Sequence, residues 1–273
     1  MIKKVSFIIG LIIFLYSIIT AIFFNNNRFY VFFCLGYLLI LDYINYKTQK
    51  KSILEELIKS KNKIYYFLAG SLLFAFAVDY LYGVLLFNIW IWKYYTTFNY
   101  IILYTLINFF FILICYELFV FVKYKLKKKI RGKKIKLTYY KKNKIQNKLW
   151  LFGILFLVLP YFYFVNISKG TGIVMVLPFI AILLLSDLFL SKYQTPYILR
   201  IFKDKLTIFT TLITTIILFI THELINIFGR EWGYLNLPFR LFSIYGVPIS
   251  AFLGWILLVL FCVSFVSWIF EIK

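Results

Sequence analysis

Charged residues are scarce in this chain. Only 15% of its 273 residues are Asp, Glu, Lys or Arg, whereas about a quarter of the residues of a typical soluble domain are charged. Hydrophobic residues make up 63% of the chain, and the mean hydropathy is +0.88. This composition excludes an ordinary soluble domain. It predicts an all-α polytopic integral membrane protein whose partners include membrane lipids.

Residues that bind metals are also scarce. The chain has one histidine, His222, and three cysteines, Cys34, Cys115 and Cys262, each inside an apolar stretch. An odd number of buried thiols does not make a disulfide framework. Zinc and haem sites need ligands that this chain hardly offers. We therefore expect no metal and no cofactor, and we interpret the three cysteines as packing residues.

Acidic residues are few beside basic ones. Ten Asp and Glu stand against 31 Lys and Arg, which gives a net charge of +21. In a soluble protein this excess would suggest nucleic acid, but here the basic residues are confined to short segments between apolar runs. We therefore expect no nucleic-acid partner. The aromatic content of 23% is typical of an AT-rich genome, so only aromatics at repeated positions count as evidence below.

Long apolar runs are abundant. A helix needs about 20 residues to cross the hydrocarbon of a bilayer, and eight runs of roughly this length are present. The first is preceded by lysines but lacks a small-residue cleavage site, so we expect a helix there and not a signal peptide. The eight predicted spans are 5–24, 29–46, 65–92, 98–122, 149–166, 171–191, 206–228 and 245–270.

The basic residues predict the orientation. Twenty-six of the 31 fall at the two termini and in the segments 47–64, 123–148 and 192–205, and five fall on the opposite side. Because Lys and Arg are enriched in cytoplasmic loops, both termini are expected in the cytoplasm of a multi-pass cell-membrane protein. We interpret 123–148 as a topology anchor and linker, which is also basic enough to contact anionic lipids.

The two sides of that linker resemble each other. "LLILDYINYK" and "LLLSDLFLSK" set Asp42 against Asp187, and a second pair of acids, Asp79 and Glu223, follows 37 and 36 residues later. We therefore predict an internal duplication.

The predicted domains are a first four-helix membrane repeat at 1–122, the basic cytoplasmic linker at 123–148 and a second four-helix repeat at 149–273. Because four is an even number, both repeats enter the membrane in the same direction. An axis along the membrane normal would relate them, as in parallel-repeat transporters.

Glu223 and Asp79 are the predicted catalytic residues, Glu223 as the leading proton donor and Asp79 as its counterpart or base. A carboxyl group buried in the membrane without a partner is protonated, and it can donate its proton to an apolar substrate. Alternatively, each acid hydrogen-bonds a neighbouring helix or caps the loop that follows it. His222 is a candidate proton relay or an interhelical hydrogen-bonding group, and it cannot face one site together with Glu223 because adjacent helix positions point about 100° apart.

The remaining buried acids receive structural interpretations. Asp42 and Asp187 lie near the cytoplasmic ends of their helices, close to Lys47 and Lys192, and could pair with lysine or extend towards water. Glu117 has no acidic counterpart in the second half and is interpreted as a helix-packing carboxyl.

A W-x-Y triplet follows the second acid of each half. Trp92-x-Tyr94 and Trp232-x-Tyr234 are predicted to bind substrate together with Asn226, as an aromatic shelf that stabilises a passing cation by about 0.5–2 kcal/mol per ring. The alternative is an ordinary aromatic belt at the outer membrane interface.

These motifs resemble a known family. Glu223, Trp232-x-Tyr234 and Gly246-x-Pro248 are similar to the pattern of membrane lycopene cyclases and related carotenoid-biosynthesis membrane proteins, over about a third of the chain. The resemblance implies protonation of a linear polyene and ring closure through a carbocation, without a redox step. The family's pattern carries a pair of glutamates after the proline, whereas this chain has Ser250 and Ala251 there.

The sequence therefore favours an acid–base enzyme that acts on a polyisoprenoid or carotenoid-like lipid, as an isomerase, cyclase or hydratase. Two other classes remain open. A proton-coupled transporter also needs duplicated halves and acids within the membrane. A non-catalytic membrane scaffold would need none of the acids.

Overall fold

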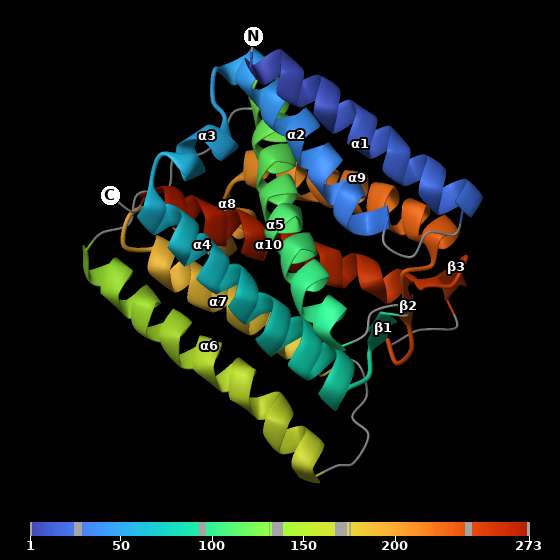
Figure 1. The fold of residues 1–273 in the computed structure, drawn as a ribbon. Helices are drawn as coiled ribbons and strands as arrows, with labels where there is room; N and C mark the ends of the chain where they lie inside the picture. The colour runs from blue at the N-terminus through green and yellow to red at the C-terminus, as the bar shows by residue number, and fades with distance from the viewer. Residues whose placement is uncertain are drawn as a thin grey trace.

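The computed structural model describes residues 2–24, 29–92, 97–130, 132, 139–166, 174, 176–237 and 242–271. Most of these residues are helical, and four very short strands lie at one end of the bundle (Figure 1). The helices are α1 (Ile2–Phe24), α2 (Phe29–Gln49), α3 (Ile53–Ile58), α4 (Lys61–Leu73), the π-helix η1 (Phe74–Leu86), α5 (Thr97–Lys127), α6 (Tyr139–Asn166), α7 (Val176–Leu190), α8 (Tyr197–Lys203), α9 (Lys205–Gly229) and α10 (Ile249–Glu271). The strands are β1 (Trp90–Trp92), β2 (Trp232–Tyr234), β3 (Ser243–Ile244) and β4 (Val247–Pro248).

The protein is a multi-pass membrane protein. Within the described residues, seven helical segments are long and apolar enough to cross a bilayer, and α4 and η1 together form one of them. Each of the seven matches a predicted span. The eighth predicted span, 171–191, corresponds to α7, an apolar helix of 15 residues, and part of that span lies outside the described residues.

The boundaries of several predicted spans need correction. The helix expected over 65–92 ends at Leu86, and residues 90–92 form β1. The span expected over 245–270 begins with β4, so α10 starts at Ile249. The helices beside the predicted linker 123–148 are longer than expected. α5 continues into the linker as far as Lys127, and α6 already begins at Tyr139.

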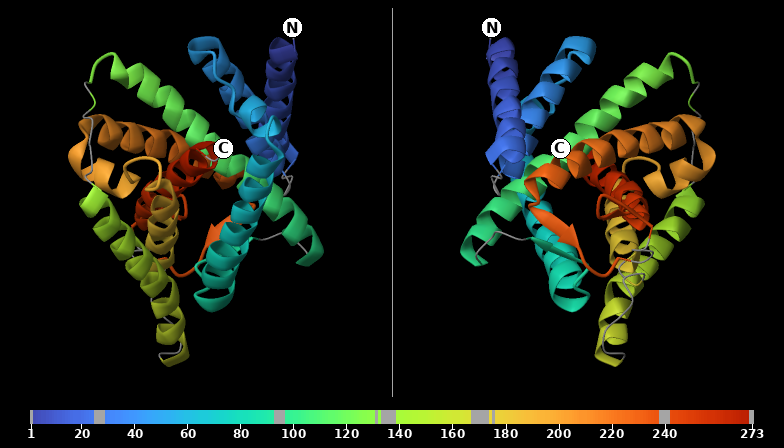
Figure 2. Two further views of the ribbon diagram at one scale, coloured as in Figure 1. Left: turned by 90° about the vertical axis from the view of Figure 1, so that its left-hand side faces the viewer. Right: turned by 90° about the vertical axis from the view of Figure 1, so that its right-hand side faces the viewer.

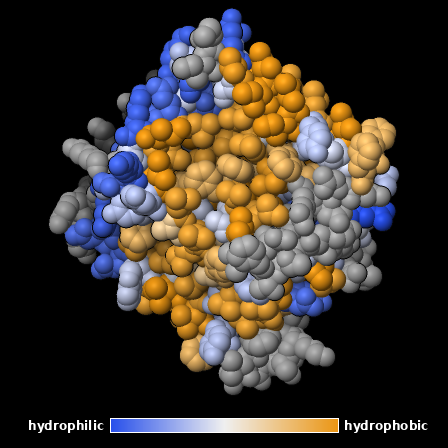
Figure 3. Space-filling view, in the orientation of Figure 1, coloured by the Kyte–Doolittle hydropathy of each residue, from blue (hydrophilic) through white to orange (hydrophobic). Residues whose placement is uncertain are grey.

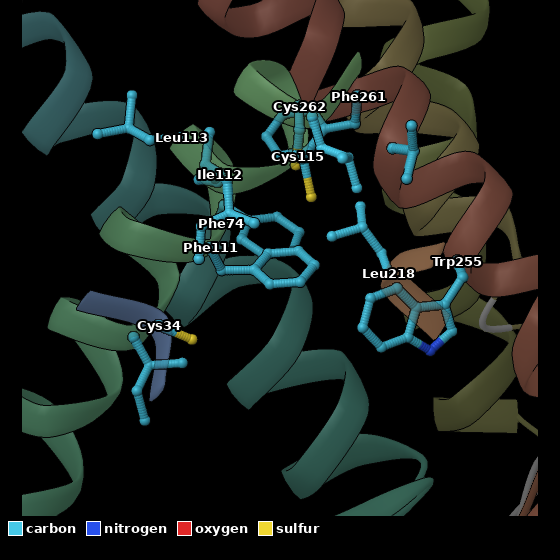
Figure 4. Packing of buried hydrophobic residues seen from close by; sticks show 14 of the residues in the cluster. Cys34, Phe74, Phe111, Ile112, Leu113, Cys115, Leu218, Trp255, Phe261 and Cys262 are labelled. Atoms are coloured by element: carbon cyan, nitrogen blue, oxygen red, sulfur yellow. The ribbon is translucent and has the colours of Figure 1, made fainter. Parts of the chain in front are cut away.

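The helices are arranged around a central pair. α5 and α10 cross in the middle, while the α1–α2 pair and the α6–α7 pair lie on opposite sides of the molecule (Figures 1 and 2). Cys34, Cys115 and Cys262 are completely buried in this core, as predicted for packing residues (Figure 4). The Glu117 side chain, on α5, accepts a hydrogen bond from Asn45 on α2, which agrees with its interpretation as a packing carboxyl.

The surface follows the membrane pattern. A broad apolar area covers the middle of the face in Figure 3, and hydrophilic residues gather along the edge at its upper left. Both chain termini lie along that edge in Figure 1. Two contacts also place the termini at this edge. Lys3 is 3.3 Å from the Asp42 carboxylate of α2, and Lys63 donates a 3.2 Å hydrogen bond to the carbonyl of Phe270 near the C-terminus.

Asp42 and Asp187 anchor the short helices at this edge. Asp42 accepts hydrogen bonds from the Leu54 backbone N–H (3.2 Å) and the Ser52 hydroxyl (2.8 Å) at the start of α3. Asp187 accepts from the backbone N–H groups of Tyr197 (2.8 Å) and Ile198 (2.7 Å) at the start of α8. The N–H groups of a first helical turn lack intrahelical partners, so both acids stabilise the helix that follows. For Asp42, the lysine partner is Lys3 and not the predicted Lys47.

Candidate functional site

Asp79 lies in an unusual helix. Residues Phe74–Leu86 form a π-helix, and the wide turn continues at its end, where the Phe87 N–H donates to the Tyr82 carbonyl five residues earlier (3.0 Å). Single π turns occur frequently at functional sites, whereas long π-helices are rare. The Asp79 side chain is 9% exposed and faces a cavity.

A two-stranded sheet closes in beside η1. β1 and β2 are antiparallel, with Trp90 opposite Tyr234 and Trp92 opposite Trp232. The sheet therefore brings the W-x-Y triplet of the second half against the sequence Trp-Ile-Trp of the first half. Predicted site residue Tyr94 lies outside the described residues.

Gly83 allows β1 to approach η1. A Cβ atom at Gly83 would lie 2.4 Å from the indole ring of Trp90. Only glycine fits this contact without moving the ring, so Gly83 sets the position of Trp90 on the cavity wall.

The cavity has a volume of about 300 Å³, which is the lower end of the range for small-molecule sites. Its walls come from η1, β1, α5, α7, β2 and α10, with Tyr30 from α2. Most of the lining is aromatic or aliphatic, and Asp79 is the one carboxyl among the described residues that form it. The aromatic lining residues are Tyr30, Phe74, Trp90, Trp92, Phe111, Phe179, Trp232, Tyr234 and Trp255; the close-up in Figure 4 shows three of these rings, Phe74, Phe111 and Trp255.

Three predicted members of the aromatic shelf line this cavity: Trp92, Trp232 and Tyr234. Trp92 and Trp232 have ring centroids 5.3 Å apart, and Trp232 is only 8% exposed. A belt residue at the membrane interface would present its ring to lipid and headgroups, whereas this ring is covered by protein.

Glu223 lies behind the cavity wall. One carboxylate oxygen accepts hydrogen bonds from the Tyr234 hydroxyl and from the Trp255 indole N–H, at 3.1 Å. Both of these residues line the cavity, whereas Glu223 is not among the described residues that do. The alternative interpretation of Glu223 was that it hydrogen-bonds a neighbouring helix or the loop that follows it. These contacts, with Trp255 on α10 and Tyr234 in β2, are of that kind. Burial and the adjacent Glu223 raise the pKa of Tyr234 well above its usual value, so Tyr234 remains the donor.

His222 points to a different partner. Its Nδ1 lies 2.5 Å from the hydroxyl of Tyr30, and Tyr30 lines the cavity. The rings of Phe33, Phe111 and Trp255 also surround it, with centroids at 5.2, 5.3 and 5.5 Å. His222 and Glu223 therefore hydrogen-bond different residues of the wall, as their adjacent helix positions predict, although both lie beside Trp255.

Asn226 joins α9 to β2. Its side-chain N–H donates to the Trp232 carbonyl (3.0 Å), and its side-chain oxygen accepts from the Trp232 backbone N–H (3.1 Å). The predicted substrate-binding amide is thus engaged with the backbone of a cavity-lining residue. In this position it fixes the Trp232 backbone at the start of β2.

Several residues in and around this site were not predicted from the sequence. Glu231 is completely buried and accepts a 3.1 Å hydrogen bond from the Tyr30 backbone N–H at the start of α2. Burial raises the pKa of its carboxyl well above the usual value, and the Tyr30 N–H opposes the shift. Trp90, Trp255 and Tyr30 were missed as cavity residues. The aromatic repetition at Trp90-x-Trp92 was the available signal for the first of these.

Comparison with known proteins assigns no family, because no family model, no curated protein and no solved structure matches this chain.

Proposed function

We propose that the cavity binds a polyisoprenoid or carotenoid-like lipid and that Asp79 protonates one of its double bonds. One observation carries the proposal: a cavity of about 300 Å³, lined by aromatic and aliphatic side chains, has one carboxyl, Asp79, among its described lining residues. Such a lining excludes charged substrates and favours an apolar one. A neutral carboxyl in such surroundings is a proton donor.

The chemistry is a proton exchange on carbon. The Asp79 carboxyl gives its proton to one carbon of a double bond, and the neighbouring carbon becomes a carbocation. Loss of a proton from an adjacent carbon, taken up by the Asp79 carboxylate, gives an isomer or a cyclic isomer of the substrate. The rings of Trp92, Trp232 and Trp90 line the same space, where each stabilises a cation by about 0.5–2 kcal/mol. This chemistry keeps the resemblance to membrane lycopene cyclases as part of the proposal.

Glu223 has a supporting role in this scheme. Its carboxylate holds the Tyr234 hydroxyl and the Trp255 indole, and so it fixes two rings of the wall. The sequence favoured Glu223 as the leading proton donor, whereas the geometry favours Asp79 for direct contact with substrate and Glu223 as a positioning residue.

We also infer an internal two-fold relation between the halves. Each half has a helix pair, α1–α2 or α6–α7, followed by a short helix that an aspartate anchors. The pairing of β1 with β2 is antiparallel, as a two-fold axis through the sheet requires. In this proposal the edge with both termini is cytoplasmic and its lysines contact anionic lipid; residues 131 and 133–138 of the basic linker lie outside the described residues.

The proposal is tested by mass spectrometry of the isoprenoid lipids of a lycopene-producing bacterial host. We expect a new isomer with the wild-type chain and none with Asp79→Asn, which keeps the shape of the side chain but removes its acidity. Gly254→Phe tests whether the substrate binds in the cavity, and we expect it to reduce product formation by filling that space. A Cβ atom at Gly254 meets no atom within 4 Å, so a phenyl group can enter the cavity without a clash at its root.

The matched control is Gly254→Ala, which adds a methyl group in open space and should leave product formation unchanged. If the lipid profile is the same with and without a folded wild-type chain, the polyene proposal is wrong. If Asp79→Asn forms product at the wild-type rate, Asp79 is not the acid. Proton flux through reconstituted vesicles in the absence of any product would instead support a transporter.

A further inference from the structure

A face of α9 carries a run of buried hydroxyl groups. Five threonines on this face are completely buried: Thr207, Thr210, Thr211, Thr214 and Thr215. At 100° per residue they fall within about 140° of the helix circumference, and His222 falls within the same arc. Glu223 lies about 100° away from His222. The threonine face of α9, defined by these five residues, therefore leads to His222 and not to Glu223.

One end of this face reaches the edge of the molecule. Asp204 precedes α9 and caps it, accepting hydrogen bonds from the Leu206 (3.3 Å) and Thr207 (3.2 Å) backbone N–H groups. The same carboxylate accepts a 2.6 Å hydrogen bond from the Thr207 hydroxyl. The polar face thus begins at a carboxylate on the side that holds α8 and the chain termini.

The middle of the face has hydroxyls that the protein does not satisfy. Thr210 donates to the Leu206 carbonyl at 2.6 Å, as threonine in a helix commonly does. Thr211, Thr214 and Thr215 differ, because no protein group among the described residues hydrogen-bonds their hydroxyls. A buried hydroxyl without a partner is unfavourable, because it gives up its hydrogen bonds to water and gains none in return. Three such groups on one helix face call for solvent partners inside the bundle.

The other end of the face reaches the cavity. His222 is completely buried, and its Nε2 also has no protein partner among the described residues. Its Nδ1 is 2.5 Å from the hydroxyl of Tyr30, which lines the cavity. Asp204 and His222 are 18 residues apart on one helix, a distance of about 27 Å.

We propose that the threonine face of α9 is a hydrated proton path from the cytoplasmic edge to His222 and, through Tyr30, to the cavity. Water molecules hydrogen-bonded to Thr211, Thr214 and Thr215 carry the proton along the helix. Thr215 and His222 are about 10 Å apart along the helix axis, and the completely buried Leu218 lies between them. In this proposal a short file of water crosses that distance. The path rests on the contacts of α9, and only the use of the proton rests on the proposed function.

Cysteine accessibility tests the path without any assay of activity. Thr214→Cys is placed in a chain whose three native cysteines are replaced by alanine, and a small water-borne methanethiosulfonate is added from the cytoplasmic side of inside-out vesicles. Only a hydrated thiol ionises and reacts. The control is Leu212→Cys, two residues away on the same helix, at a side chain that is 37% exposed on the apolar surface.

We expect the thiol at position 214 to react at least about tenfold faster than the thiol at position 212, because only the first is in contact with water. Equal rates, or no reaction at position 214, would overturn the path and leave the threonine face as dry helix packing. This outcome does not depend on whether the protein converts a polyene.

A second pair of variants connects the path to the proposed function. Thr214→Val keeps the shape of the side chain and removes its hydroxyl, whereas Thr214→Ser keeps the hydroxyl. If the path supplies the proton, Thr214→Val slows product formation and Thr214→Ser forms product at the wild-type rate, with lipid binding unchanged in both variants. A wild-type chain that forms no product while position 214 is accessible would refute the proposed function and leave the path. Equal product formation by Thr214→Val and Thr214→Ser would refute the supply of protons along α9.

Discussion

At the residue scale, the buried acids differ in what they contact. Asp42, Asp187 and Glu231 accept hydrogen bonds from backbone N–H groups at the starts of α3, α8 and α2. Such acids are explained by the helix that they cap. Asp79 instead lines an apolar cavity, and this position distinguishes it from the others.

The sequence predicted part of this difference between helix-capping acids and the cavity acid. It identified Asp42 and Asp187 as structural from their place near helix ends, but not the backbone groups that they cap, because α3 and α8 are too short for a clear periodicity. It selected Asp79 and Glu223 by their place within apolar spans and by their spacing. Spacing could not show that Tyr234 and Trp255 stand between Glu223 and the cavity, since that depends on how α9 packs against α10.

Glu231 provides a prediction at this scale. Glu231→Gln keeps an oxygen that accepts from the Tyr30 N–H, so we expect its stability in detergent to remain close to wild type at acidic pH. Glu231→Ala removes the acceptor from the start of α2, and we expect a loss of about 1–2 kcal/mol, typical of a lost helix cap. Thermal unfolding of the two purified variants measures the difference.

The same residue predicts a pH dependence. Burial raises the folded-state pKa of Glu231, so the folded protein holds this proton more tightly than the unfolded chain does. Its stabilisation is therefore complete below the unfolded pKa and is lost as the pH rises through the raised folded value. Glu231→Gln should remove this part of the decline. An identical decline in both proteins would contradict the assignment.

At the element scale, the π-helix and the strands position the site. η1 presents Asp79, and the β1–β2 pair brings Trp92 and Trp232 to the same cavity. Neither element was predicted. An apolar run of 13 residues has too little polar contrast to distinguish a π-helix from an α-helix, and a three-residue strand is too short for alternation to be recognised. The long membrane helices, by contrast, follow directly from hydropathy and length.

Two glycines give a matched prediction for these elements. Gly83→Ala puts a Cβ atom 2.4 Å from the Trp90 ring, and we expect it to displace β1 and to lower stability by about 1–3 kcal/mol, as overpacking does. Gly254→Ala adds the same methyl group where no atom lies within 4 Å, so it should be nearly neutral. Comparable unfolding temperatures for both variants would mean that the approach of η1 to β1 is not tight.

At the scale of the whole molecule, the two ends of the bundle have different chemistry. One end carries the termini, α3 and α8 with their aspartate anchors, and the other carries the two small sheets (Figures 1 and 2). The cavity belongs to this second end, because β1 and β2 line it. The sequence predicted a polytopic bundle from composition, and an orientation from its lysines. How the halves enclose a cavity depends on packing between α5 and α10, which no single segment specifies.

The orientation is tested with two exposed positions at opposite ends. Tyr245, between β3 and β4, is 85% exposed, and Phe202, on α8, is 78% exposed. With the native cysteines replaced, we expect Tyr245→Cys to react with a membrane-impermeant maleimide in intact cells, because the proposed orientation places its end outside the cell. Phe202→Cys should react only after the cells are opened. The reverse pattern would place the termini outside the cell.

The most direct test of the central claim is deuterium incorporation. Membranes that contain the wild-type chain and lycopene are incubated in D₂O, and the lipid product is analysed by mass spectrometry. If Asp79 exchanges its proton with solvent and transfers it to the polyene, each protonation followed by loss of a different proton leaves one deuterium on carbon, and Asp79→Asn gives no labelled product. A product without deuterium, or an equally labelled product from Asp79→Asn, would contradict acid catalysis by Asp79.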